Sequence, residues 1–266
     1  MIKLNGWSVE INKFPDGTIL MKQEPVLGGA HLIDWKFQSN EELVALNFLT
    51  NHLRDNGAER IELRMWYIPN ARQDRVKKPE DVFTLKYFAK MINDLKFDKV
   101  YVLDPHSNVS AALFDNLVVC TPEFLITDVY NRVTKLINTE DVVMFYPDEG
   151  AMKRYSEMIP RPYAFGIKER DWSDGVIKGL SVFGEDVVKG KNILIVDDIS
   201  SRGGTFYHSA KKLKEIGAER IFLLITHCEN TILDGEVLTS GLIDRVYTTN
   251  SLFTSEHEMI EVIDIW

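Results

Sequence analysis

The segment spanning residues 193–205 constrains the fold of this chain more than any other. It starts with four apolar residues at 193–196, continues with Asp197 and Asp198, and reaches Gly203-Gly204-Thr205 after a short polar stretch. The apolar run is typical of a central strand in a parallel sheet, and the glycines allow positive φ, so that successive N–H groups converge on an anion. Apolar residues at helical spacing follow Thr205. We therefore predict an α/β fold with a phosphate site at the start of a helix.

Two interpretations of this segment are open from its residues alone. In the first, the loop amides hold a sugar phosphate, and the Asp197–Asp198 pair holds either ribose hydroxyls or a magnesium ion. In the second, the segment is an ordinary strand end with an acidic turn and a helix cap. A Gly-Gly-Thr triplet alone favours the second interpretation, whereas the strand, the acidic pair and Gly-Gly-Thr in this order favour a phosphoribosyl site.

Apolar strand-like runs alternate with helical patterns along the chain. This alternation predicts an α/β fold with mainly parallel sheets. Strands are expected at 61–68, 100–103, 142–146, 193–196 and 221–226, and helices at 41–56, 83–95 and 205–216.

The pentapeptide Gly-Ala-Glu-Arg-Ile occurs twice, at 57–61 and 217–221. Each copy follows a helical pattern and leads into a strand, with glycine ending the helix. Chance similarity between helix–strand junctions is one explanation, and we favour the other, a duplicated domain. The boundary is expected near Thr121-Pro122, where a proline follows an apparent edge strand. It divides the chain into domains 1–120 and 121–266.

The composition narrows the class of function. A formal charge of −9 argues against a general nucleic-acid binder or a binder of anionic membranes, although a local cationic pocket remains compatible with it. Two cysteines encode neither a disulfide framework nor a cysteine-rich metal site. No apolar stretch approaches the length of a membrane span. We expect a soluble, cytoplasmic protein with small anionic substrates.

Residues 193–205 resemble the phosphoribosyl-pyrophosphate loop that phosphoribosyltransferases share with the ribose-phosphate pyrophosphokinase family. Five further blocks, in family order, resemble the pyrophosphokinases. They are Phe14-Pro15-Asp16-Gly17-Thr18, Ala71-Arg72-Gln73-Asp74-Arg75, Asp104-Pro105-His106, Pro147-Asp148-Glu149-Gly150 and Lys168-Glu169-Arg170.

The resemblance implies two related phosphoribosyltransferase-like domains, each a mainly parallel sheet flanked by helices, with the active site between them. It also implies a reaction in which the anomeric hydroxyl of ribose 5-phosphate attacks the β-phosphorus of ATP. AMP then departs, and a diphosphoryl group is transferred intact. In this family the element around Phe14 reaches a neighbouring subunit's site, so a homo-oligomer, dimer or hexamer, is expected.

The resemblance also assigns roles to residues. Catalysis falls to Lys168 and Arg170, in a segment that Gly166 and Gly175 would hinge as a lid. The remaining roles are ATP binding by Phe14, Asp16, Arg72, Gln73, Asp74 and His106, magnesium (Mg²⁺) binding by His106 and Asp148, and ribose 5-phosphate binding by Asp197, Asp198, Ser201, Arg202, Gly203, Gly204 and Thr205. Without the family, these blocks are solvated charge runs, surface turns and a hydrogen-bonding histidine.

Departures from the family pattern keep other functions open. Thr18, Pro105 and Ala151 replace the usual Glu, Leu and Gly, and few residues precede Phe14, which implies a shortened member. One rival is a nucleobase phosphoribosyltransferase that consumes phosphoribosyl pyrophosphate. The other is a non-catalytic regulatory protein associated with a synthase. Retention of the lysine–arginine pair and the acidic pair favours an active synthase.

Overall fold

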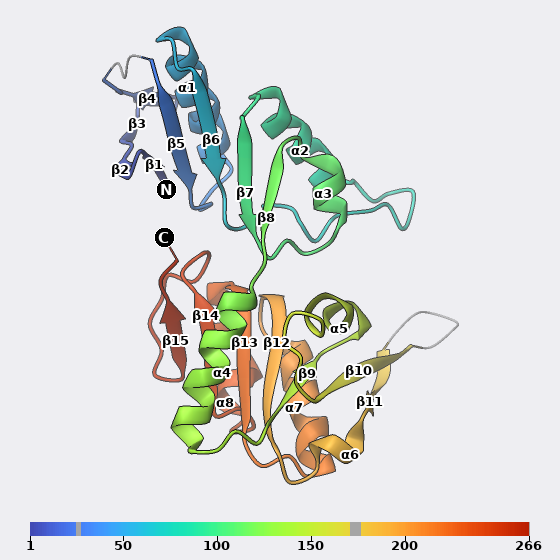
Figure 1. Cartoon of the computed structure of the whole chain (residues 1–266). Coiled ribbons are helices and arrows are strands. Elements are labelled where there is room, and N and C mark those ends of the chain that lie inside the picture. The colour runs from blue at the N-terminus through green and yellow to red at the C-terminus, as the bar shows by residue number, and fades with distance from the viewer. Residues whose placement is uncertain (25–27, 171–176, 266) are drawn as a thin grey trace. The chain divides into compact units, whose positions relative to one another are not determined.

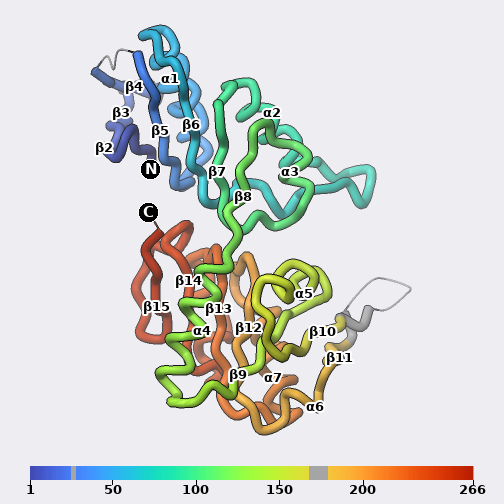
Figure 2. Tube along the Cα trace, in the orientation of Figure 1, coloured from blue at the N-terminus to red at the C-terminus, as the bar shows by residue number. Residues whose placement is uncertain are grey.

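The computed structural model describes residues 1–24, 28–170 and 177–265. The chain divides into two compact units, residues 1–121 and 122–266. Each unit is built around a sheet flanked by helices, as Figures 1 and 2 show. The predicted α/β class, with two related units, is confirmed.

The first unit contains a six-stranded sheet. Its order is β2 (Trp7–Ser8), β1 (Ile2–Leu4), β5 (Ala30–Trp35), β6 (Arg60–Arg64), β7 (Lys99–Leu103) and β8 (Leu117–Cys120). The strands from β5 to β8 run parallel, whereas β1 and β2 are antiparallel. The helices are α1 (Glu41–Asp55), α2 (Thr84–Asp94) and α3 (Val109–Leu113).

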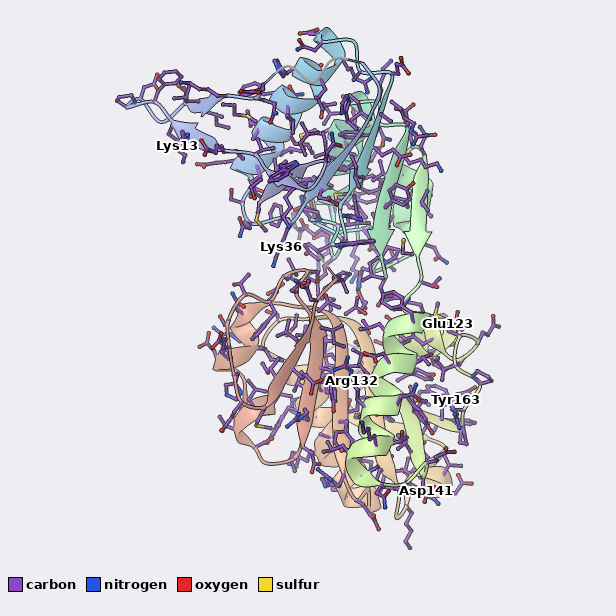
Figure 3. The ribbon with its side chains drawn as sticks, turned by 60° about the vertical axis from the view of Figure 1, so that its left-hand side comes forward. Lys13, Lys36, Glu123, Arg132, Asp141 and Tyr163 are labelled. Carbon is purple, nitrogen blue, oxygen red and sulfur yellow. The ribbon has the colours of Figure 1, made fainter. Side chains whose placement is uncertain are left out.

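A single core holds this unit together. Leu46 and Leu49 of α1 and Phe88 of α2 pack with the apolar residues of the strands. A separate hairpin, β3 (Ile11–Lys13) and β4 (Ile19–Met21), stands beside the sheet. Lys13, labelled in Figure 3, donates to Glu41 at the start of α1 at 2.9 Å, which ties the hairpin to the helix.

The second unit contains a seven-stranded sheet. Its order is β11 (Ile177–Phe183), β10 (Tyr163–Arg170), β9 (Val142–Tyr146), β12 (Asn192–Ser200), β13 (Ile221–Cys228), β14 (Arg245–Thr249) and β15 (Ile260–Ile263). All neighbours pair in parallel except β10 and β11. Its helical elements are α4 (Glu123–Ile137), α5 (Glu149–Tyr155), α6 (Glu185–Val188), α7 (Gly204–Ile216), the 3-10 helix η1 (Asn230–Asp234) and α8 (Glu236–Thr239).

Both faces of this second sheet are covered. Successive side chains of a strand point to opposite faces. Ile193 and Ile195 of β12 therefore join one core with α7, whereas Leu194 and Val196 join the other with α4 and α5. A parallel strand that is buried on both faces reads as a continuous apolar run, which explains the pattern found in the sequence.

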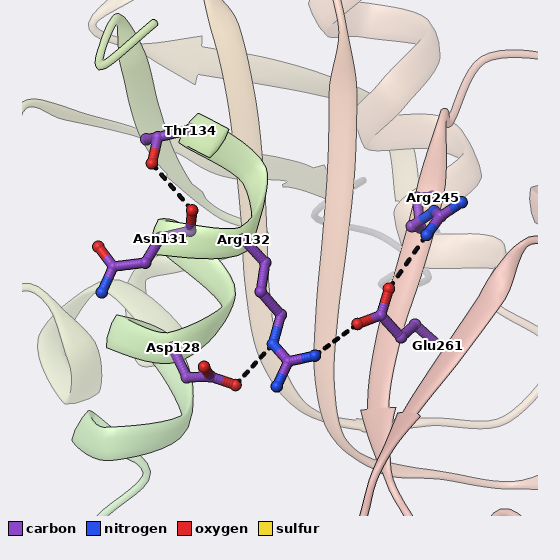
Figure 4. Close-up of polar contacts among 6 residues, drawn as sticks. All are labelled: Asp128, Asn131, Arg132, Thr134, Arg245 and Glu261. Carbon is purple, nitrogen blue, oxygen red and sulfur yellow. Dashed lines mark hydrogen bonds and ion pairs between the residues drawn. The ribbon is translucent and has the colours of Figure 1, made fainter. Parts of the chain in front are cut away.

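A polar network fastens α4 across the outer edge of this sheet. Arg132 donates to Asp128 at 2.8 Å and to Glu261 of β15 at 2.7 Å, and Glu261 accepts from Arg245 of β14 at 3.0 Å (Figure 4). Because these groups are partly exposed, each pair adds little stability by itself. Together they link one helix to two strands.

The duplicated pentapeptide occupies equivalent places. Gly57 follows α1 with φ of +81° and Gly217 follows α7 with φ of +108°, and each precedes a strand. The predicted strand 61–68 is too long, because the chain leaves the sheet after Arg64. Met65 and Ile68 remain buried beyond that point, so their apolar character reflects a packed loop.

Gly166, a predicted hinge, lies at a packed position of the sheet. It lies inside β10, opposite Val182, and a Cβ atom placed on it would come within 2.6 Å of the Pro147 carbonyl oxygen. Close approach of two backbones therefore explains this glycine. Gly175 lies outside the described residues. Within the described ranges, every helix is too short or too polar to span a bilayer.

Candidate active site

The loop between β12 and α7 has a backbone that only glycine accommodates at its centre. Gly203 has φ of +76°, and a Cβ atom there would lie 2.7 Å from Val237 Cγ1. Gly204 and Thr205 are exposed and begin α7, a helix of 13 residues. The first N–H groups of a helix lack intrahelical acceptors and favour an anion. The glycine loop therefore lies at a helix start, as predicted, and whether it binds a phosphate stays a prediction.

A second segment, residues 229–237, supports this loop from outside. A Cβ atom on Gly235 would lie 1.9 Å from the Arg202 carbonyl oxygen, so the two backbones touch. Ser201 Oγ lies 3.1 Å from Thr231 Oγ1. The conformation of the loop is therefore set by packing before any ligand binds.

The two aspartates at the end of β12 have different environments. Asp198 is 4% exposed, and its Oδ1 lies 3.1 Å from Arg154 Nη1 of α5. The Asp198 N–H donates to Asp197 Oδ1 at 3.0 Å. Loss of hydration, and then the negative charge of Asp198, raise the pKa of Asp197 well above its ordinary value. Arg154 thus places a positive charge beside Asp198.

Asp148 follows β9, at the same edge of the sheet. Its Oδ1 accepts from the Ala151 N–H at 3.0 Å and caps α5. Its negative charge also raises the pKa of Asp197, as one of the smaller causes. Asp148 therefore lies close enough to the acidic pair to act on it electrostatically.

The donor set of this edge is compatible with magnesium. Within the described ranges, no three or more His, Cys, Asp or Glu side chains are grouped to hold a metal ion. Mg²⁺ generally keeps several waters and binds through one or two carboxylates together with substrate phosphates. Asp148 supplies a carboxylate of that kind.

Lys168 and Arg170 lie near the end of β10. The β10 backbone pairs antiparallel with β11, with Lys168 opposite Leu180 and Arg170 opposite Ile177. The register shifts between Glu169 and Arg170. The predicted extended segment is therefore one arm of a hairpin, with a bulge just before Arg170.

In the first unit, the structure brings Asp74 and His106 near each other, after β6 and β7. Asp74 is 5% exposed and accepts two hydrogen bonds from Arg75, at 2.6 and 2.8 Å. These bonds are the largest cause that lowers the pKa of Asp74 to about 2, and the nearby charge of His106 contributes less. Asp74 is thus an ionised carboxylate that binds the neighbouring Arg75 side chain.

The neighbours of Asp74 differ in their surroundings. Arg72 is exposed. Gln73 Oε1 accepts from Thr84 Oγ1 at 2.8 Å, at the start of α2. Gln73 therefore holds its segment against a helix, which agrees with a supporting role more than with direct contact to a base.

Phe14 and Asp16 lie on the hairpin β3–β4. Asp16 Oδ1 accepts from the Thr18 hydroxyl at 2.7 Å and the Thr18 N–H at 2.9 Å, and these bonds lower its pKa. Phe14 is 48% exposed and lines a groove of about 720 Å³ with Phe48 and His52 of α1. In Figure 1 the hairpin lies beside β5, whereas the loop before α2 extends past α3. The structure therefore separates this element from the Asp74 segment.

Sequence reasoning missed three residues of the site. Arg154, Gly235 and Val237 contact the acidic pair or the glycine loop from elsewhere in the chain. Nothing in local spacing marks such contacts. Arg154 does lie in the helix that Asp148 caps, which places it close to a predicted site residue in the sequence.

The parallel sheets, the strand–glycine loop–helix connection and the acidic pair define a protein of the phosphoribosyltransferase-like class. The comparisons with known proteins are more specific. Residues 2–95 match the N-terminal domain of ribose phosphate pyrophosphokinase, and residues 178–265 match the phosphoribosyl synthetase-associated domain.

Whole-chain relatives agree with these matches. The ribose-phosphate pyrophosphokinase of Pyrococcus furiosus is 30% identical over 256 residues, which cover 93% of this chain and 87% of the relative. That of Thermococcus kodakarensis is 31% identical over 255 residues, with 92% and 86% covered. The chain therefore belongs to the ribose-phosphate pyrophosphokinase family of diphosphotransferase enzymes.

A solved structure shows the same fold. Phosphoribosylpyrophosphate synthetase from Mycobacterium smegmatis matches with a TM-score of 0.79 at 23% identity. The match covers 97% of this chain and 86% of that chain. The arrangement of strands and helices described above is therefore the arrangement of that protein.

Proposed function

We propose that this chain transfers the diphosphoryl group of ATP to the anomeric hydroxyl of ribose 5-phosphate, giving phosphoribosyl pyrophosphate and AMP. The observation that carries the proposal is the glycine loop between β12 and α7, which begins a helix and follows two carboxylates. Family membership supplies the reaction class.

The second unit, predicted as residues 121–266, is the ribose 5-phosphate side of this proposal. Ser201, Gly203, Gly204 and Thr205 bind the 5-phosphate, with Arg202 adding a charge-assisted contact. In addition, Asp197 and Asp198 accept hydrogen bonds from the ribose hydroxyls. Support comes from the positive φ of Gly203 and from the exposure of Gly204 and Thr205.

The first unit, predicted as residues 1–120, is the ATP side. Arg72 contacts phosphate, and Gln73 and Asp74 support it. Phe14 and Asp16 contact the adenine bound by a neighbouring copy of the chain, which requires a homo-oligomer, a dimer or a hexamer. The exposure of Phe14 supports this role, since a buried ring would be unable to reach another copy.

Catalysis in this proposal is mostly electrostatic and positional. Lys168 and Arg170 stabilise negative charge that develops on the transferred group. His106 and Asp148 would hold Mg²⁺ on the ATP phosphates, where the ion neutralises charge and aligns the reacting oxygens. The two free thiols, Cys120 and Cys228, fit a reducing, cytoplasmic location.

One assay tests this function against its rivals. The purified chain is incubated with ribose 5-phosphate, Mg²⁺ and ATP, and the products are separated chromatographically. The proposal expects AMP and phosphoribosyl pyrophosphate in equal amounts. Base-dependent release of pyrophosphate from phosphoribosyl pyrophosphate would instead identify a nucleobase phosphoribosyltransferase. Stimulation of another synthase, with no turnover by the chain alone, would identify a regulatory protein.

A further inference from the structure

Helix α5 presents one cation to the acidic pair. Arg154 Nη1 lies 3.1 Å from Asp198 Oδ1, and the two side chains are 23% and 6% exposed. An ionised carboxylate that is removed from water needs a partner, because burial of an uncompensated charge is costly. Arg154 is such a partner for Asp198.

The pleat of β12 directs the side chains of the two aspartates to opposite faces of the sheet. Asp198 follows Leu194 and Val196 in alternation, on the face that packs against α4 and α5. Asp197 follows Ile193 and Ile195 and belongs to the other face. Arg154 therefore approaches the pair from the face of the sheet to which Asp198 belongs.

The guanidinium of Arg154 is itself fixed in place. Its Nη1 donates to the Tyr155 hydroxyl at 3.2 Å, and its central carbon lies 5.4 Å from the centre of that ring. Tyr155 is fully buried, with its ring 6.2 Å from that of Tyr146. By contrast, Lys153 pairs with Glu149 on the solvent side of the helix at 2.7 Å, with both side chains largely exposed.

We propose that Arg154 is a positioning residue of the ribose site, which holds the Asp198 carboxylate in the orientation that accepts hydrogen bonds from the sugar hydroxyls. This inference rests on the proposed function. A carboxylate has two oxygens and about four lone-pair sites, so it can accept from Arg154 and from a sugar hydroxyl together. A guanidinium suits this task because its planar fork fixes the carboxylate in direction as well as in distance.

The experiment compares three variants with the wild type. In Arg154→Ala, the KM for ribose 5-phosphate should rise about ten- to a hundredfold, the range of one charged hydrogen bond, while the KM for ATP changes less than threefold. In Arg154→Lys, part of this loss should be recovered. Lys153→Ala is the matched control, because it removes an exposed cation from the same helix, and it should behave as the wild type.

A double-mutant cycle tests whether Arg154 acts through Asp198. If it does, Arg154→Ala should add little in an Asp198→Asn background. The double variant also removes both partners of the buried pair, so it folds even where Arg154→Ala alone leaves an unpaired charge and unfolds. Circular dichroism and calorimetric titration with ribose 5-phosphate accompany each variant.

The outcomes separate the two proposals. Additive effects in the cycle, or an unchanged KM for ribose 5-phosphate in Arg154→Ala or in Asp198→Asn, would overturn the positioning role while the wild type still makes phosphoribosyl pyrophosphate. A wild type that makes none overturns the proposed function. In that case the role of Arg154 is tested by comparing the calorimetric affinities of the wild type and of Arg154→Ala for ribose 5-phosphate. If the wild type does not bind ribose 5-phosphate at all, the positioning role is overturned as well.

Discussion

The two units share a strand–helix–strand core but differ at one connection. The core is β5–α1–β6 in the first unit and β12–α7–β13 in the second, and both copies of Gly-Ala-Glu-Arg-Ile lie at its helix–strand junction. In the second unit, the first strand leads into its helix through two aspartates and two glycines. In the first unit, the connection is Lys-Phe-Gln-Ser-Asn at 36–40, without glycine.

The start of α1 already has an anion of its own. Glu42 is 8% exposed, and its Oε2 accepts from the Gln38 N–H at 2.8 Å and from Trp35 Nε1 at 3.0 Å. A carboxylate of α1 itself therefore takes up donors of β5 and of the connection, and it also pairs with the N-terminal ammonium of Met1. The shared strand–helix–strand core therefore places a connection at the same point in both units. The residues of that connection decide whether its hydrogen-bond donors serve folding or bind a ligand.

The largest expected effect tests whether catalysis belongs to the second unit. Lys168→Ala and Arg170→Ala should each lower turnover by two or more orders of magnitude, with smaller changes in KM, because cations on a phosphoryl-type transition state act mainly there. Steady-state kinetics measure this loss. Lys189→Ala, at an exposed lysine of the same unit, serves as the control. Unchanged turnover in both variants would remove the catalytic role.

Gly235→Ala should have the next largest effect. Since the added methyl group would overlap the Arg202 carbonyl oxygen, the glycine loop must shift. We expect a rise of tenfold or more in the KM for ribose 5-phosphate, together with a melting temperature several degrees lower. Gly204→Ala is the matched control for folding, because its Cβ atom meets nothing within 4 Å. An unaltered KM in Gly235→Ala would contradict the view that packing sets the loop.

Two buried aspartates should respond to pH in opposite directions. The pKa of Asp74 is lowered to about 2 from an ordinary 3.8, so its stabilising effect is present above 3.8 and is lost as the pH falls toward 2. Asp74→Asn should lower the stability of the first unit by about 1–2 kcal/mol at neutral pH, a value discounted because Arg75 is exposed. Thermal melts from pH 2 to pH 7 should show the difference from wild type shrinking in acid.

Asp197 should change the pH dependence of folding stability in the opposite direction. Because its pKa is raised in the folded state, folding binds a proton, and stability falls as the pH rises above 3.8 through the raised value. Asp197→Asn should therefore melt at a higher temperature than the wild type at neutral pH, while the KM for ribose 5-phosphate rises. A lower melting temperature at neutral pH would show that Asp197 stabilises the fold, as Asp74 does.

Local patterns predict much of this fold. The strand expected at 142–146 coincides with β9, and the helix expected at 205–216 differs from α7 by one residue, because apolar spacing and terminal glycine are local signals. By contrast, β5 was missed because His31 and Asp34 interrupt its apolar run. Asp34 is paired with Arg64, a partner from the neighbouring strand that spacing does not reveal.

In the candidate site too, local sequence patterns do not reveal contacts between distant residues. The glycine loop and its acidic pair are contiguous in sequence and were predictable as a group. The contact of Arg154 with Asp198, and that of Gly235 with Arg202, join residues far apart in the chain. A glycine required by close approach looks in sequence like a glycine required by motion, so the contact of Gly166 with the Pro147 backbone was not predictable.

The smallest effect is expected for a substitution of Glu42, the carboxylate in the first turn of α1. Glu42→Gln keeps the shape of the side chain, replaces charged hydrogen bonds to Trp35 and Gln38 by neutral ones and removes the ion pair with the Met1 ammonium, with a loss of about 1 kcal/mol. The melting temperature should fall by a few degrees, and both KM values and turnover should remain those of the wild type. If the variant instead lost affinity for ribose 5-phosphate, the start of α1 would be a ligand site, and the contrast between the two connections would be wrong.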